Sequence, residues 1–320
     1  MTSILVTGAG GMIGARVAAA AERAGYDVTR LVRSPAPGAI AHDLTRPLHR
    51  PPPHDWVFHL AGNYAGASRR ALKRADLAMA KNLTRWGGAR NWVFASAAEV
   101  YGDVDGIAGE GAPTRPAIPY GEIKLAAEAL FARMTRGDGK VVILRIGEVY
   151  DRHARLVREL SSRLKRGFCP WPGSGRVPVS FVHAEDVAEA FVRAVERAPA
   201  GVSIYNVADA EPATWREFLL AFAERLGTPP PVFLPRPLVR VYALGHSLTH
   251  ALAGREPALT RHAVRLLTTP KPLSIDKIGR ELGYAPRWSG IRSGLKDVLN
   301  GVPHHAQDGA AQGGATRAPA

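Results

Sequence analysis

The sequence lacks the features that would place it in an oxidising environment or in a membrane. It has one cysteine, Cys169, which excludes an internal disulfide and favours a reducing compartment. No apolar run approaches the roughly 18 residues that suggest a membrane span. The chain opens on Ser3–Gly8, an apolar run that ends in a glycine turn, so a first strand is predicted rather than a signal peptide. We therefore expect a cytoplasmic protein without a membrane partner, and we predict no metal site.

Acidic side chains are few relative to basic ones. Lys and Arg together number 42 against 28 Asp and Glu, giving a formal net charge of +14, and 34 of the 42 are arginines. The arginines are scattered, with no compact basic block and no interleaved aromatic residues. The pattern of nucleic-acid binding is therefore missing, and no nucleic-acid partner is predicted. A small anionic ligand remains compatible with this charge.

The first half of the chain alternates short apolar runs with longer helical stretches. With 320 residues, the chain is long enough for one large domain and a smaller one. Strands are predicted over 3–9, 27–33, 56–61, 92–97 and 140–146, and helices over 12–24 and 122–134. Strand–helix alternation of this kind predicts an α/β fold with a doubly wound parallel sheet of the Rossmann type.

The alternation loosens after about residue 150, where Gly, Pro and Trp gather over 167–178. We predict a dinucleotide-binding domain over 1–150, to which about 181–209 returns. A smaller, discontinuous substrate domain is expected from 151–180 and 210–302. A helix is expected over 238–253, either for packing or as a substrate lid. The Gly-, Ala- and Gln-rich stretch 303–320 predicts a disordered tail.

A glycine-rich turn follows the first predicted strand. Gly8, Gly11 and Gly14 stand three residues apart, with Met12 and Ile13 opening the next helix. Glycine permits the tight turn and lets a pyrophosphate approach the backbone, and the amide groups at a helix N-terminus favour negative charge. The turn therefore predicts a dinucleotide site, the alternative being a turn that holds no ligand.

The spacing T-G-x-x-G-x-x-G resembles that of extended short-chain dehydrogenases/reductases, in particular the NAD-dependent epimerase/dehydratase group, over about residues 3–300. Tyr120 and Lys124 form a Y-x-x-x-K pair that lies 106 residues after Gly14, as this group has it. Four residues apart on a helix, the two side chains share one face. The resemblance implies that Tyr120 is the general acid or base and that Lys124 binds the nicotinamide ribose. We expect the ammonium of Lys124 to lower the pKa of Tyr120.

The end of the second predicted strand carries the choice between NAD and NADP. A carboxylate there suits the ribose 2′-hydroxyl of NAD, and an arginine suits the 2′-phosphate of NADP. Asp27 stands at the start of this strand, at the wrong edge, whereas Arg33 and Ser34 stand at its end. NADP is therefore the predicted cofactor, with NAD as the alternative. The resemblance adds Asp43 and Leu44 at the adenine, and Leu60 and Ala61 beside the cofactor.

The third catalytic position departs from the family. Counting back from Val100, the usual Ser or Thr is replaced by Ala97, and Ser96 stands one residue earlier. On a strand this offset turns a side chain to the opposite face. Ser96 is our candidate for the missing hydroxyl, the alternative being a hydrogen-bonded residue at the strand end. Glu99 is a second candidate for proton transfer.

Further segments resemble the family with changes. In Leu144–Tyr150 the usual proline is Ile146, and Asp151 replaces the following glycine, which predicts altered contacts on the nicotinamide side. The segment Phe181–Ala188 matches the family closely, and its His183 and Asp186 are interpreted as structural.

Three functions remain open from the sequence. The first is an NADP-dependent oxidoreductase that reduces a carbonyl or oxidises a secondary alcohol of a small molecule. The apolar stretch 232–244 favours an apolar substrate. The second is a nucleotide-sugar epimerase or dehydratase with recycled NAD, although Val179 occupies the place where such members tend to have an arginine and Arg176 lies further back. The third is a cofactor-binding sensor. A homodimer is the protein partner that the resemblance allows.

Overall fold

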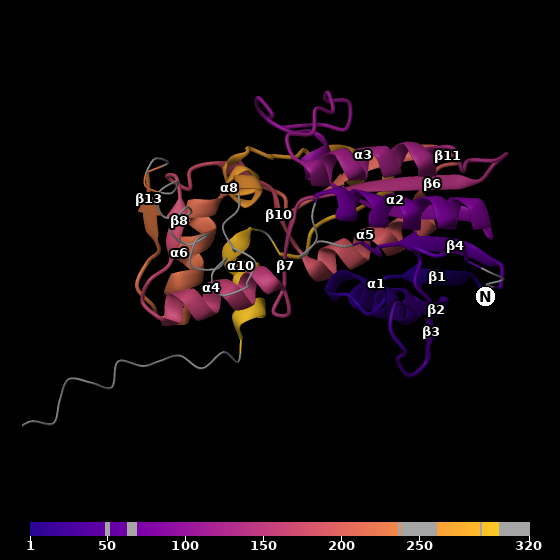
Figure 1. The fold of residues 1–320 in the computed structure, drawn as a ribbon, viewed down its shortest axis with the longest axis horizontal. Coiled ribbons are helices and arrows are strands. Elements are labelled where there is room, and N and C mark those ends of the chain that lie inside the picture. Colours follow the sequence, from indigo (N-terminus) through magenta and orange to yellow (C-terminus); the bar gives the residue numbers. More distant parts are fainter. Residues whose placement is uncertain (49–51, 63–68, 236–237, 239–260, 289, 301–320) are drawn as a thin grey trace, which may run out of the picture.

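The computed structural model describes residues 1–48, 52–62, 69–235, 238, 261–288 and 290–300. Its larger half has three layers, with helices on both faces of a sheet, and its smaller half lies beyond one end of the strands (Figure 1). No helix in the described part of the chain is long and apolar enough to cross a membrane.

The central sheet has seven strands, and all of its neighbouring pairs are parallel. Their order across the sheet is β11-β6-β5-β4-β1-β2-β3, so the direction of winding reverses between β1 and β4. A reversal of this kind opens a crevice at the carboxyl ends of the strands, where ligands bind. The strands are β1 (Ser3–Thr7), β2 (Asp27–Val32), β3 (Ala39–Ala41), β4 (His54–His59), β5 (Ala89–Ala97), β6 (Lys140–Ile146) and β11 (Gly201–Val207).

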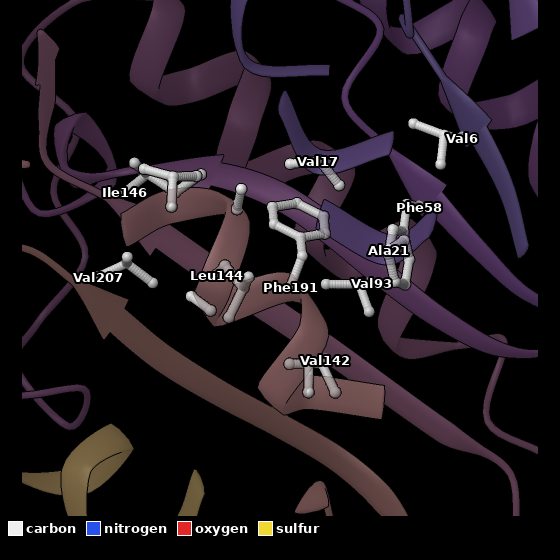
Figure 2. Close-up of a cluster of buried hydrophobic side chains, with 14 of the residues drawn as sticks. Val6, Val17, Ala21, Phe58, Val93, Val142, Leu144, Ile146, Phe191 and Val207 are labelled. Atoms are coloured by element: carbon white, nitrogen blue, oxygen red, sulfur yellow. The ribbon is translucent and has the colours of Figure 1, made fainter. Parts of the chain in front are cut away.

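The alternation of side chains along β1 divides the core into two layers. Ile4 and Val6 pack toward α1 (Met12–Arg23) and α5 (Ala184–Arg197), in the cluster that includes Phe191 (Figure 2). Leu5 points the other way, toward α2 (Arg69–Trp86) and α3 (Pro119–Ala132). Near-complete burial of both faces explains why these strands are almost continuously apolar.

The smaller half has an aromatic core of its own. Phe181 stacks on Phe218 with ring centroids 4.6 Å apart, and Trp171 and Trp215 complete the cluster. These rings pack the short strands of the smaller half against the helices around them. The elements are α4 (Arg155–Lys165), β8 (Pro170–Pro172), α6 (Trp215–Leu226), β13 (Val232–Leu234), α8 (Arg261–Thr268) and α10 (Ile291–Leu299). Three-residue strands β7 (Glu148–Tyr150) and β10 (Phe181–His183) pair at the junction, and β9 (Pro178–Val179) pairs with β12 (Ala213–Thr214).

An ion-pair network joins the two halves. Arg16 of α1 binds the carboxylates of Asp151 and Glu185, the second at 2.9 Å. Asp151 also accepts a hydrogen bond of 2.7 Å from the backbone amide of His153. The residue that departs from the family at position 151 therefore fixes the chain as it leaves β7, and it is almost fully buried there.

The predicted Rossmann-type α/β fold is confirmed, and the structure adds elements that the sequence pattern did not predict. They include β3, α2 and the start of α3 at Pro119, three residues before the predicted start. The helix α9 (Asp276–Leu282), assigned to the substrate domain from sequence, packs instead with α5 and β11, because Ile278 and Leu282 join the core of the larger half. The predicted tail 303–320 and nearly all of the predicted helix 238–253 lie outside the described residues.

Candidate active site

The glycine turn has the geometry of a phosphate cradle. Gly8 has a φ of 72°, and its carbonyl accepts a hydrogen bond of 2.9 Å from the amide of Gly11. A Cβ at Gly8 would lie 2.7 Å from the amide nitrogen of Ala61, and a Cβ at Gly14 would clash with the carbonyl of Gly8. Gly11 caps α1 without a side-chain hydrogen bond, which leaves its N-terminal amides for a ligand. These residues fit the pyrophosphate of a dinucleotide.

The turn opens onto a cavity of about 570 Å³ at the carboxyl ends of the strands. Its walls come from the glycine turn, the ends of β4, β5 and β6, the start of α3, and α4 from the smaller half. Ten of the candidate residues named from sequence line this cavity: Gly8, Gly11, Met12, Ile13, Gly14, Leu60, Ser96, Glu99, Tyr120 and Lys124. The crevice expected from the strand order is therefore a real cavity, and it holds the Tyr–Lys pair.

Tyr120 and Lys124 lie on the first turns of α3, where Pro119 occupies the start of the helix. The Lys124 ammonium donates a hydrogen bond of 2.9 Å to the carbonyl of Ala95 and lies 5.7 Å from the centre of the Tyr120 ring. Burial lowers the pKa of Lys124, opposed by Asp76, Glu99 and Glu128.

The pKa of Tyr120 differs from the sequence expectation. Burial raises it well above the usual value, and the carboxylates of Glu99, Asp76 and Glu148 raise it further. The expected lowering of the Tyr120 pKa by Lys124 is not found; burial and the three acidic neighbours raise it instead. Tyr120 is therefore held as a neutral phenol, the form that donates a proton.

The residue after Tyr120 is a glycine, Gly121, because its backbone lies close to that of Glu99. A Cβ at Gly121 would clash with the carbonyl of Glu99, in the short helix η1 (Ala98–Val100) that follows β5. The missing side chain lets α3 lie against η1 and brings the phenol of Tyr120 to the edge of the sheet. The sequence carried this signal as a glycine at the second position of Y-G-x-x-K.

Ser96 lines the cavity, but its hydroxyl is already engaged. It donates a hydrogen bond of 2.5 Å to the carboxylate of Glu128, which in turn binds Arg145 through two hydrogen bonds of 3.0 and 2.8 Å. All three side chains are buried. Glu128 lies one turn after Lys124, so the hydrogen bond of Ser96 joins the end of β5 to α3. Ala97, at the position of the usual hydroxyl, is buried and also lines the cavity.

Glu99 takes part in a second charged cluster. Its carboxylate accepts a hydrogen bond of 2.7 Å from the ammonium of Lys271, which lies 3.4 Å from the carboxylate of Glu148. Glu99 and Glu148 both line the cavity. We call Glu99, Lys271 and Glu148 the Lys271 cluster. Sequence reasoning singled out Glu99 alone from this group.

The adenosine end of the site is more open. Arg33 and Ser34 follow β2 and are exposed, and the Arg33 side chain has no hydrogen-bond or ion-pair partner among the described residues. Asp27 pairs with Ser3 at the opposite edge of the sheet, as its place at the strand start predicts. Asp43 accepts hydrogen bonds of 3.0 and 2.8 Å from Thr45, which lower its pKa, and Leu44 is buried in the core.

Two junction residues stay outside the cavity lining. The His183 ring accepts a hydrogen bond of 3.2 Å from the amide of Glu185 and caps α5, and Asp186 accepts one of 2.9 Å from the amide of Arg287. Both contacts are structural. Among the described residues, no group of three His, Cys, Asp or Glu side chains is arranged to hold a metal ion.

The fold agrees with what comparison with known proteins finds. The model of the NAD dependent epimerase/dehydratase family matches residues 4–208. This chain belongs to that family, and it has the nucleotide-binding fold and the short-chain dehydrogenase/reductase character of an NAD(P)-dependent enzyme.

Two curated relatives carry the name of a reductase. A ketoreductase of Stigmatella aurantiaca, named for 4-hydroxy-2-methyl-3-oxo-4-farnesyl-3,4-dihydroquinoline-1-oxide, is 33% identical over 180 residues, covering 55% of this chain and 53% of the relative. The chain thus matches about half the length of that relative. A 3-diazoavenalumate denitrifying reductase from a Streptomyces species is 27% identical over 326 residues, covering 91% of this chain and 98% of the relative.

Solved structures show the same fold. The human epimerase family protein SDR39U1, isoform 2, solved with NADPH, has a TM-score of 0.76 and 21% identity, covering 94% of this chain and 100% of that one. At this level of identity the likeness supports the arrangement of the elements, including those of the smaller half.

Proposed function

We propose that this protein is an NADP-dependent oxidoreductase that reduces the carbonyl group of a small molecule or oxidises the corresponding secondary alcohol. The observation that carries the proposal is the meeting of the glycine turn, Tyr120 and Lys124 in one cavity. The names of the two reductase relatives support the direction of the chemistry.

Some residues of the site would bind the cofactor, and another would transfer a proton. The amides at the start of α1 and the space above Gly8 would hold the pyrophosphate, and Lys124 would hold the nicotinamide ribose. When bound, the dinucleotide exchanges a hydride with the substrate carbon. Tyr120, kept neutral by burial, donates its proton to the carbonyl oxygen in reduction and accepts it back in oxidation.

Part of the cavity wall is apolar. Ile146, Val149 and Leu156 line it, and these residues support an apolar substrate. The stretch 232–244 gives less support than expected from sequence, since its described part, β13, pairs with β8. Phe233 there packs under the guanidinium of Arg216, 4.3 Å from its ring centre. The remainder, apart from the exposed Pro235 and Leu238, lies outside the described residues.

Tyr120→Phe tests the catalytic assignment. Removing the phenolic proton should lower kcat for ketone reduction by about 10²–10⁴-fold, with the Kd for NADPH nearly unchanged. The measurement is NADPH oxidation with a panel of aromatic and aliphatic ketones, beside a fluorescence titration of NADPH. Turnover that survives in Tyr120→Phe would show that another group donates the proton. A wild-type protein that binds NADPH tightly but reduces no ketone would instead support the cofactor-binding sensor.

Arg33→Ala tests the cofactor. Loss of a charge-assisted contact to the 2′-phosphate should weaken NADPH binding by about 10–100-fold and leave NADH binding unchanged. Arg133→Ala, an exposed arginine at the end of α3, is the matched control. An equal loss for both cofactors, or a preference of the wild-type protein for NADH, would overturn the role of Arg33.

One observation favours a nucleotide-sugar epimerase or dehydratase as second candidate. His153, Arg155 and Arg158 line the α4 side of the cavity and would meet an anionic substrate. Against this, Val179 is buried, and Arg176 is exposed and is not among the cavity-lining residues. NAD that stays bound through purification, together with saturable binding of UDP-glucose that is lost in Arg155→Ala/Arg158→Ala, would favour this candidate.

A further inference from the structure

The two carboxylates of the Lys271 cluster line the same cavity as Tyr120. The Lys271 side chain is 3% exposed, and its ammonium contacts Glu99 at 2.7 Å and Glu148 at 3.4 Å. The carboxylates are 10% and 19% exposed, in that order. Glu99 follows β5 and Glu148 follows β6, so the ends of two neighbouring strands present them to the same lysine.

The backbone of Lys271 is fixed against the junction of the two halves. Its amide donates a hydrogen bond of 2.9 Å to the carbonyl of Pro178, and its carbonyl accepts one of 3.1 Å from the amide of Ser180. Prolines at positions 270 and 272 restrict the chain on both sides. The ammonium is therefore held in place between the two carboxylates.

The cluster has two carboxylates for one ammonium. The carboxylates outweigh burial and raise the pKa of Lys271, so the lysine stays charged. Burial raises the pKa of Glu148, which Lys271 only partly opposes and Glu99 reinforces. Glu148 is the more exposed carboxyl and the one farther from the ammonium. A proton on Glu148 therefore relieves the excess negative charge at the least cost in ion pairing.

The position of Glu148 relates it to the reacting groups. It lines the same cavity as Tyr120 and Lys124, and its charge is near enough to Tyr120 to raise the pKa of the phenol. Ala97 lines this cavity without a hydroxyl group. The carboxyl of Glu148 is thus a second protic group facing the space where a substrate oxygen would lie.

We propose that Glu148, set against the Glu99–Lys271 ion pair, holds a proton and exchanges it with Tyr120 during turnover. The proposal rests on the proposed function for the identity of the reaction, and on the cluster geometry for the identity of the residue.

In the direction of reduction, the proton that Tyr120 gives to the substrate is replaced from Glu148. With NADPH bound, the substrate carbon would receive a hydride from it, and the carbonyl oxygen would take the phenolic proton of Tyr120. The resulting phenolate takes the proton of Glu148, and a proton from solvent, carried by water that enters the cavity, reprotonates the carboxylate. The sum is one ketone, one NADPH and one proton converted to one alcohol and one NADP⁺.

Other charged groups face Glu148 from the surrounding elements. Glu99 of η1 and Lys271 form the cluster with Glu148. Tyr120 and Lys124 lie on α3, and the charge of Asp76 on α2 raises the pKa values of both. Across the cavity α4 and the residues before it contribute His153, Arg155 and Arg158. A pH profile of turnover must therefore be read against variants of the cluster itself.

Infrared spectroscopy tests the protonation of Glu148 without any substrate. In an infrared pH titration the wild-type protein should show a carboxylic-acid C=O band that is absent in Glu148→Gln and that is lost at lower pH in Glu99→Gln than in the wild type. Asp186 and Asp209 are also carboxyls of raised pKa, so the band is assigned from the difference between wild type and variant. A difference spectrum without a carboxylic-acid band would overturn the proposal.

The pH dependence of kcat tests the exchange with Tyr120. Reduction should slow as pH rises through the pKa of Glu148, and Glu148→Gln should lower kcat at least tenfold at low pH and remove this limb. Lys271→Met should move the limb to higher pH, because the ammonium no longer favours the carboxylate. Glu99→Gln should move it to lower pH, because a like charge is lost and Lys271 is left to Glu148 alone.

These opposite shifts separate proton exchange from a structural role. If Lys271→Met fails to fold, Glu99→Gln, which keeps the size of the side chain, decides on its own. A limb that stays in Glu148→Gln, or that does not move in Glu99→Gln, overturns the exchange. A wild-type protein that reduces no ketone overturns the proposed function, whereas the infrared difference still decides whether Glu148 holds a proton.

Discussion

Two buried charged clusters flank α3, and they differ in balance. On one side Glu128 meets a single cation, Arg145, through two hydrogen bonds of 3.0 and 2.8 Å, and the Ser96 hydroxyl adds a third contact. On the other side Glu99 and Glu148 share Lys271. The first cluster is neutral, closed and almost fully buried, and the second carries an excess negative charge at the cavity wall.

The same two strands supply both clusters. Ser96 and Arg145 are register partners on β5 and β6, and Glu99 and Glu148 follow shortly after the ends of these strands, in η1 and β7. Along this edge of the sheet, a cluster with one carboxylate for one cation is therefore followed within a few residues by a cluster with two carboxylates for one cation. The difference indicates that the Glu128 cluster holds α3 in place and that the Lys271 cluster is available for proton exchange.

Among the variants that test this comparison, Arg145→Met should change stability the most. It leaves the carboxylate of Glu128 buried without its cation, which should lower the free energy of unfolding by about 3–5 kcal/mol. Glu148→Gln, the control from the other cluster, should change it by less than about 1 kcal/mol, because it removes an excess charge. Urea unfolding of both variants makes the measurement. Equal losses would show that the two clusters are equally structural.

Asp209→Asn sharpens the comparison with a buried carboxyl whose side-chain hydrogen bond comes from Tyr150 rather than a cation. Burial, reinforced by Asp186, raises the pKa of Asp209 from 3.8 to about 7. The folded protein therefore holds this proton more tightly than the unfolded chain. Its contribution to stability is complete below the unfolded pKa and is lost as pH rises to about 7, at a rate of up to about 1.4 kcal/mol per pH unit.

The variant should remove that slope between pH 6 and 7, while Asp186, with a pKa of about 6, keeps a slope at lower pH. Urea unfolding at a series of pH values is the measurement. A slope between pH 6 and 7 that is the same in the variant and the wild type would assign the proton to another group.

Ser96→Ala should have the smallest effect. It removes one hydrogen bond to Glu128 while the ion pair with Arg145 remains, so stability should fall by about 1 kcal/mol and kcat by less than tenfold. Thermal or urea unfolding and ketone reduction give the two values. A fall in kcat of about 10²–10³-fold without a matching loss of stability would show instead that Ser96 donates directly to the substrate.

The sequence predicted the larger half of the fold well because its signals are local. The glycines of the turn, the apolar runs and the proline before Tyr120 each act within a few residues, and the structure places β1, α1 and β6 within two residues of the predicted ranges. β3 has three residues and two of them are exposed, so it carries no hydrophobic pattern to detect.

The rest of the candidate site depends on contacts between distant residues. Lys271 reaches Glu99 across 172 positions, and a lysine between two prolines has no local feature that indicates burial in a cavity wall. Glu148 carried a weak signal, as an acidic residue just past the end of a buried parallel strand. The replacement at Asp151 was visible, but its partner Arg16 lies 135 positions earlier, so the ion pair was not predictable.

The distance between Glu99 and Lys271 also has a consequence for how the protein is made. Because synthesis runs from the N-terminus, the glycine turn, Tyr120 and both carboxylates leave the ribosome well before Lys271. Domains also tend to fold from the N-terminus as they emerge. Until residue 271 arrives, the emerging cavity carries two acidic groups with no ammonium between them. A late part of the chain therefore supplies the ammonium that completes the site. The nascent chain contains the glycine turn before it contains the cation of the Lys271 cluster.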